Sequence, residues 1–143
     1  MRKLNLDLLQ DGVLGISRNR GNSWYEAVLV ALEQNNHFKD VVFTVSGDLE
    51  DDFVLFWDYQ LSKNALLSWN DLTELAEEAA TGIALLLVYK FTDFKVSWRE
   101  RKGDKIDYFL SKQITSGILK ADALLEVSGI LKETKNNRLS SRV

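Results

Sequence analysis

The residues best suited to chemistry are two carboxylates in the last third of the chain, Asp107 and Glu126. Cleavage of a phosphodiester requires hard oxygen ligands for Mg²⁺, an ion that neutralises phosphate charge and lowers the pKa of the attacking water. Two carboxylates on neighbouring strands supply such ligands. Asp107 and Glu126 are therefore candidate ligands for Mg²⁺ if the fold brings them together.

The segments that must position these residues have the pattern of β-strands. The first alternates strictly between apolar and polar residues, and the others are rich in apolar residues and follow polar turns. The predicted strands cover residues 94–99, 105–110 and 123–128. Alternation places Lys105 and Asp107 on one face of the second strand, and Glu126 and Ser128 on one face of the third. If these two faces coincide, the carboxylates converge.

A helix is predicted over residues 69–90, before these strands, because its apolar residues recur along one stripe. Acidic residues lie beside that stripe, at Glu74, Glu77 and Glu78. The order helix, strand, strand, strand resembles the core of the PD-(D/E)XK nuclease superfamily, over roughly residues 70–130. The resemblance implies a restriction-endonuclease-like fold. In that fold an Asp on the second strand and an E-x-K on the third bind the metal, and the helix carries a further acidic residue.

The resemblance assigns roles to particular residues of this chain. Asp107 and Glu126 match the strand-borne metal ligands, and Glu77 or Glu78 matches the helix acid, with Glu78 taken into the predicted metal site. The chain departs from the pattern at Ser128, which stands where the superfamily has Lys. Lys105 lies on the Asp107 face, so it is the predicted replacement from the neighbouring strand.

A basic cluster surrounds the turn between the first two of these strands. Arg99, Arg101 and Lys102 are predicted to contact a nucleic-acid backbone, with Trp98 and Tyr108 available for stacking on bases. The charge distribution agrees, because residues 1–94 hold 7 basic and 15 acidic side chains whereas residues 95–143 hold 11 and 6. The alternative for the basic cluster is a turn that is merely solvated. The alternative for the carboxylates is that Asp107 is a solvent-facing strand residue beside this turn and that Glu126 pairs with Lys105 or Lys120 across the sheet.

Two further segments, residues 102–109 and 125–131, resemble signatures of an uncharacterised bacterial protein family of similar length. This resemblance implies a bacterial or phage origin and carries no activity with it.

The first half of the chain supplies the rest of an α+β fold. A capping box at Ser23 and Glu26 predicts a helix over residues 23–35, which ends at an Asn pair, and a possible short strand precedes it over residues 4–9. Apolar runs at 41–45 and 53–57 predict a hairpin with an acidic connection. The expected order is αββαβββ, with a mixed or antiparallel sheet packed against two helices. We expect a single domain over residues 1–143, in which residues 131–143 form a short helix or a frayed tail.

Composition excludes several classes of function. The chain has no Cys and one His, so thiol chemistry, zinc sites and His-dependent triads lack their residues. Phosphate-binding loops and serine-hydrolase elbows are also missing. The N-terminus lacks the apolar core of a signal peptide, and the longest apolar run is far too short to span a bilayer. We therefore expect a cytoplasmic protein that does not interact with membranes.

Two functions of different class follow. The first is a Mg²⁺-dependent nuclease-like or nucleic-acid-binding protein. The alternative is a non-catalytic adaptor that binds a protein partner, or a homo-oligomer that pairs through the apolar strand at 53–57 or through the two apolar helices.

Overall fold

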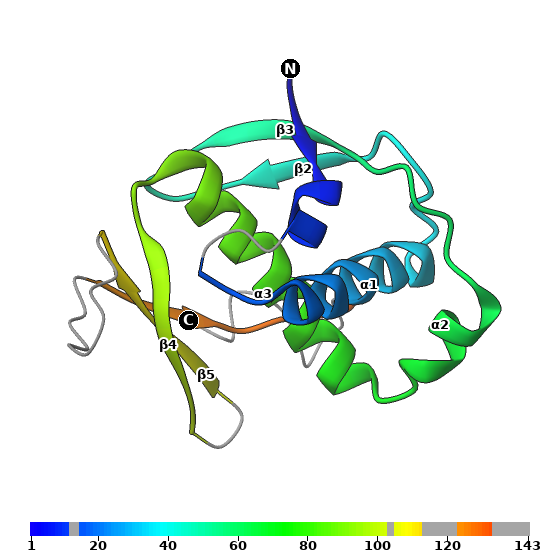
Figure 1. The fold of residues 1–143 in the computed structure, drawn as a ribbon. Coiled ribbons are helices and arrows are strands. Elements are labelled where there is room, and N and C mark those ends of the chain that lie inside the picture. Colours follow the sequence, from blue (N-terminus) through cyan, green and yellow to red (C-terminus); the bar gives the residue numbers. More distant parts are fainter. Residues whose placement is uncertain (12–14, 103–104, 113–122, 133–143) are drawn as a thin grey trace.

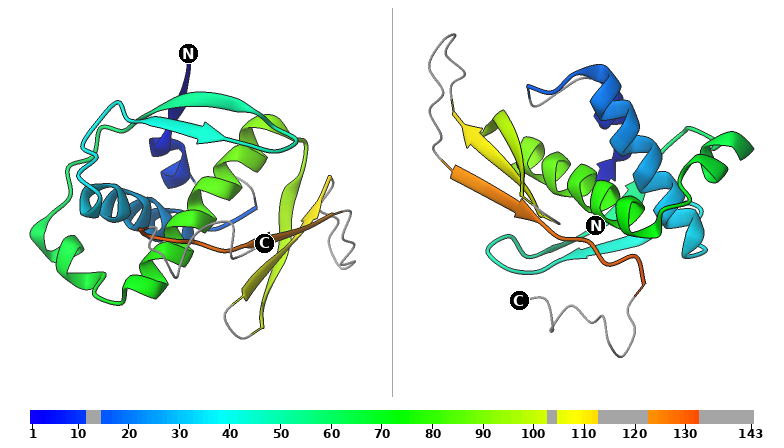
Figure 2. Two further views of the ribbon diagram at one scale, coloured as in Figure 1. Left: turned by 180° about the vertical axis from the view of Figure 1, so that it is seen from behind. Right: turned by 90° about the horizontal axis from the view of Figure 1, so that it is seen from below.

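The computed structural model describes residues 1–11, 15–102, 105–112 and 123–132, and at residues 97–102 and 105–107 it describes the backbone. Helices and strands are mixed in one compact domain, which confirms the predicted α+β class. The strands form two separate three-stranded sheets, where one sheet was expected. The sheets lie on different sides of the long helix α3 (Leu72–Phe91), and helix α1 (Arg18–Gln34) packs on a third side (Figures 1 and 2).

The first sheet contains the predicted hairpin. Strand β2 (Val42–Val45) pairs antiparallel with β3 (Asp51–Phe56), and β1 (Arg2–Asn5) pairs parallel with the other edge of β3. β1 accounts for part of the strand expected at 4–9, since the chain turns into a 3₁₀-helix at Leu6–Asp11.

Strand β3 is the central strand of this sheet, and its apolar residues belong to the core. Phe53, Leu55 and Trp57 are all buried there. They therefore do not form an exposed apolar patch, and pairing of two copies stays a prediction.

Helix α1 begins five residues before the capping box that was predicted to start it. Its N-cap is Ser17, whose hydroxyl accepts a hydrogen bond from the Arg20 backbone N–H at 3.2 Å. Gly21 allows this earlier start, because any Cβ at that position would collide with the Leu9 carbonyl oxygen of the 3₁₀-helix. The predicted end is confirmed: Asn35 is the C-cap, and Asn36 adopts a left-handed φ of 61°.

Helix α3 confirms the second predicted helix and begins at Leu72, after the N-cap Asp71. The Asp71 carboxylate accepts hydrogen bonds from the backbone N–H groups of Thr73 and Glu74, at 3.0 and 3.1 Å. A short helix, α2 (Lys63–Ser68), precedes it and was not predicted. None of the helices in the described part of the chain is long and apolar enough to cross a membrane.

The second sheet is the predicted three-strand unit. Strands β4 (Lys95–Lys102), β5 (Lys105–Ser111) and β6 (Ala123–Val127) are antiparallel, in the order β4-β5-β6. β4 extends three residues beyond its expected end at residue 99, and its register shifts between Val96 and Trp98. Residues 133–143, most of the predicted terminal helix or tail, lie outside the described residues.

Candidate functional site

The two candidate metal ligands are register partners in the second sheet. Asp107 on β5 lies directly opposite Glu126 on β6, and Glu100 on β4 lies opposite Asp107 on the other side. Directly opposite positions of an antiparallel pair share a face of the sheet, with Cβ atoms about 4.5–5.5 Å apart in general. The backbone thus makes these two positions direct register partners, and the approach of their carboxylates stays a prediction.

The positions Glu100, Asp107 and Glu126 form a row across the three strands. This row belongs to the face of the sheet that points away from the helices. The neighbouring positions on β5, Tyr108 and Leu110, are buried, and they pack with Trp24 of α1 and Leu85 of α3 in the smaller of the two core clusters. Glu126 is exposed.

Lys105 lies two positions before Asp107 on β5, opposite Lys102 of β4. On the β6 side, the last pair of the ladder is Ile106 with Val127. One more step in the same register leads from Lys105 toward Ser128, the residue that stands in place of the motif Lys. Lys105 and Ser128 therefore each lie two positions along their strands from the Asp107–Glu126 pair, on the same side of that pair.

The residues predicted to contact phosphate are divided between the two faces of the sheet. Arg99 lies opposite Tyr108, and Arg101 lies opposite Ile106. Because positions alternate between faces along a strand, 99 and 101 belong to the other face from Asp107. Lys102 shares its cross-strand row with Lys105 and so lies on the Asp107 face of the hairpin.

Glu78 lies in a different environment from Glu126. It is 8% exposed, and its Oε2 accepts a 2.6 Å hydrogen bond from the indole Nε1 of Trp24. The Trp24 ring in turn meets the ring of Tyr108 edge-on, with centroids 6.0 Å apart. Glu78 thus contacts Trp24 in the buried interface of α1 and α3, and no described contact joins it to Glu126. Glu77, the alternative helix acid, is half-buried on the same helix.

Two positions of the β5–β6 pair carry the type of oxygen ligand that a hard cation prefers. Asp107 and Glu126 provide two carboxylates, and Mg²⁺ is commonly held by one or two carboxylates while it keeps several waters. Among the described side chains no group of three or more His, Asp or Glu could hold a metal. The roles of Asp107, Glu126 and Glu78 in metal binding stay predictions.

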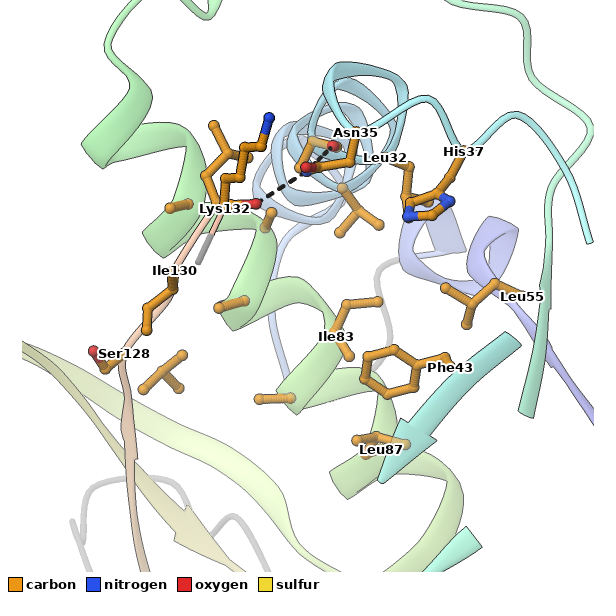
Figure 3. Close-up of a pocket in the computed structure, with 18 of the residues that line it drawn as sticks. Leu32, Asn35, His37, Phe43, Leu55, Ile83, Leu87, Ser128, Ile130 and Lys132 are labelled. Atoms are coloured by element: carbon orange, nitrogen blue, oxygen red, sulfur yellow. Dashed lines mark hydrogen bonds between the residues drawn. The ribbon is translucent and has the colours of Figure 1, made fainter. Parts of the chain in front are cut away.

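A large apolar cavity, which the sequence interpretation missed, opens beside β6 (Figure 3). Its volume is about 810 Å³, and Ile83 and Leu87 of α3 face Phe43 of β2 across it. Glu126 and Ser128 line one wall. Small residues of α3 leave this space, and their helical spacing was the available signal: Ala76, Ala79, Ala80 and Ala84.

The segment that follows β6 closes one side of this cavity and is fixed at two points. Gly129 lies against α3 so closely that a Cβ would collide with the Ala76 carbonyl oxygen. Asn35, at the end of α1, donates from Nδ2 to the Leu131 carbonyl oxygen at 3.0 Å and to that of Ala31 at 3.1 Å. These contacts hold the segment after β6 against both long helices.

Comparison with known proteins gives no relative: no protein-family model, no curated protein and no solved structure matches this chain. The functional argument therefore rests on the residues of the chain itself.

Proposed function

We propose that the protein is a Mg²⁺-dependent nuclease or a nuclease-like nucleic-acid-binding protein, with Asp107 and Glu126 as its metal ligands. The observation that carries the proposal is the direct register pairing of these two positions on β5 and β6. The order of elements supports it as well, since helix α3 is followed by three antiparallel strands, the arrangement that the superfamily resemblance implies.

In this proposal the metal would supply charge neutralisation at the scissile phosphate and a water of lowered pKa. The chain would supply the geometry. Asp107 and Glu126 would hold the ion. Lys105, two positions before Asp107 on β5, would orient the water or stabilise the phosphate. Arg99, Arg101 and Lys102 would bind backbone phosphates on either side of the β4–β5 hairpin.

The surrounding fold suits such a site because it holds the two strands rigidly. β5 is anchored by the burial of Tyr108 and Leu110, and the chain after β6 is fixed through Gly129 and Asn35. Catalytic groups must be held within a fraction of an ångström of their working positions, so anchored strands serve better than loops. The proposal does not require Glu78 to leave its hydrogen bond with Trp24.

The test is cleavage of single- and double-stranded DNA and RNA in Mg²⁺ or Mn²⁺ by the wild-type chain, Asp107→Asn and Glu126→Gln. Matched controls are Asp48→Asn and Glu50→Gln, which change the same residue types at exposed positions outside this sheet. We expect metal-dependent cutting that both site variants lose by at least about 100-fold and both controls retain.

Two results would contradict the nuclease proposal. One is cutting that survives in both site variants. The other is no cutting by the wild type together with no nucleic-acid binding and an unchanged melting temperature in Mg²⁺, since a bound ion stabilises the folded state. The latter result would favour the non-catalytic adaptor, and capture of a protein partner would become the next experiment.

A further inference from the structure

A second cavity lies at the end of α1 that is farther from the β4-β5-β6 sheet (Figure 1). Its volume is about 540 Å³, and it is bounded by the last turn of α1, the loop at 37–39 and the segment at 57–61 that follows β3. Its aromatic and charged lining is Glu33, Phe38, Lys39, Trp57, Asp58 and Tyr59. It shares none of the residues assigned to nuclease chemistry.

Three of the ten lining residues are Phe38, Trp57 and Tyr59. Trp57 is buried, whereas Phe38 and Tyr59 remain 64% and 44% exposed. The Tyr59 ring is supported from behind by Tyr25, which it meets edge-on with centroids 6.0 Å apart. Aromatic faces carry negative electrostatic potential and attract cations, most strongly for Trp and Tyr. Two of the three rings, those of Phe38 and Tyr59, are therefore accessible from solvent.

The loop that carries Phe38 is held in an unusual conformation. Asn36 and Asp40 have left-handed φ angles of 61° and 54°, and they bracket the three loop residues that line the cavity. Few residues other than glycine adopt this region, although Asn and Asp tolerate it best. The backbone thus turns sharply on both sides of Phe38 and presents that segment to the cavity.

The charges around the cavity are unbalanced in the direction that favours a cation. Neither Glu33 nor Asp58 forms an ion pair with another residue in the described part of the chain. The C-terminal end of α1 adds the partial negative charge of its terminal carbonyl groups. Lys39 is the opposing charge in the lining, and it is exposed. His37 also lines the cavity.

Hydrogen bonds link Asp58 to Asp7 and, through Asp7, to Tyr25. The Asp58 backbone N–H donates to the Asp7 carboxylate at 3.3 Å, and that carboxylate also accepts the Tyr25 hydroxyl. Burial raises the pKa of Tyr25 above its ordinary value, and the hydrogen bond to Asp7 and the charges of Asp7 and Asp58 raise it further.

We propose that this cavity binds a small organic cation with an alkylated ammonium group, seated among Phe38, Trp57 and Tyr59 and neutralised by Glu33 and Asp58. An alkylated ammonium suits the lining because its methyl groups contact aromatic faces without a loss of hydrogen bonds. A bare divalent ion does not, because it requires six or more oxygen ligands that three aromatic rings cannot supply. The site is independent of the nuclease proposal.

The probe is choline, titrated against ¹⁵N-labelled protein at constant ionic strength, with 3,3-dimethylbutan-1-ol as its neutral isostere. We expect saturable shifts of the amides at 37–39 and 57–60 with choline, and about three- to tenfold weaker binding of the isostere. The same shifts should persist in Asp107→Asn, which separates this site from the nuclease site. Equal affinity for both probes, or no saturable shift with choline, would overturn the proposal.

Variants locate the site. Phe38→Ala and Asp58→Asn should each weaken choline about three- to tenfold, and Lys39→Ala should strengthen it. Leu67→Ala is the matched control for Phe38→Ala, because Leu67 is 66% exposed and does not line the cavity. Since Phe38 is also exposed, its variant should fold. Unchanged choline affinity in folded Phe38→Ala would contradict the assignment.

Discussion

The indole N–H of Trp24 donates to the carboxylate of Glu78 at 2.6 Å, across the buried interface of the two long helices. This contact joins residues 54 positions apart in the chain. A buried donor that loses its acceptor retains the cost of its desolvation. Glu78→Ala should therefore lower the free energy of unfolding by about 1–3 kcal/mol, measured by urea denaturation.

The contact is tested further by a double-mutant cycle with Trp24→Phe, which removes the donor and leaves an aromatic ring. If the hydrogen bond is the cause, Glu78→Ala should cost measurably less in the Trp24→Phe background. Glu50→Ala, at an exposed position, is the control and should change stability by less than about 0.5 kcal/mol. Purely additive effects would contradict a direct interaction.

Stability at high pH should depend on Tyr25. Because its folded-state pKa is raised above 10.0, its contribution is fully present below pH 10.0 and is lost as the pH rises from there through the folded pKa. Urea unfolding at about pH 9 and about pH 11 should show a steeper loss in wild type than in Tyr25→Phe. Equal losses would show that Tyr25 does not keep its proton in the folded state.

Gly129 should be intolerant of any side chain. Gly129→Ala would drive its Cβ into the Ala76 carbonyl oxygen, so the segment after β6 must shift away from α3. We expect a loss of about 1–3 kcal/mol in the free energy of unfolding. Leu124→Ala, at an exposed position of β6, should cost less and is the control. If the Gly129 variant is as stable as wild type, the close packing on α3 is not needed.

Lys105 and Lys102 are register partners but should differ in effect. If Lys105 acts on the reacting phosphate, Lys105→Ala should reduce kcat by about 100-fold. Lys102→Ala should instead raise KM and reduce the salt dependence of binding, since it would contact a backbone phosphate. Single-turnover cleavage at two salt concentrations separates these outcomes. Equal effects of both variants on kcat would refute the separate roles.

Local patterns in the sequence predicted most elements of the fold. The strict alternation before residue 100 predicted a strand, because burial of one face imposes that period. The runs at 41–45 and 53–57 predicted strands because they are rich in β-branched and aromatic residues. The start of α1 could not be predicted from its caps. Ser17 and Ser23 both precede helix-forming residues, and the contact of Gly21 with Leu9 decides between them.

The sequence also could not show how the strands divide into two sheets. β1 joins β3 in parallel, so the first sheet is complete without the second hairpin. For the candidate site, alternation supplied the faces of Asp107 and Glu126, but their register comes only from the pairing of β5 with β6. The burial of Glu78 was hidden, because a Glu beside an apolar stripe gives no sign of a buried indole across from it.

The most direct test of the central claim, that Asp107 and Glu126 share one metal ion, is Mg²⁺ binding measured by calorimetry in the wild type, both single variants and the double variant. We expect one ion per chain, with Asp107→Asn and Glu126→Gln each weakening binding by at least tenfold, on the order of 1.4 kcal/mol, and the double variant showing strongly non-additive loss. Wild-type affinity in both single variants, or additive small losses, would contradict a shared ion.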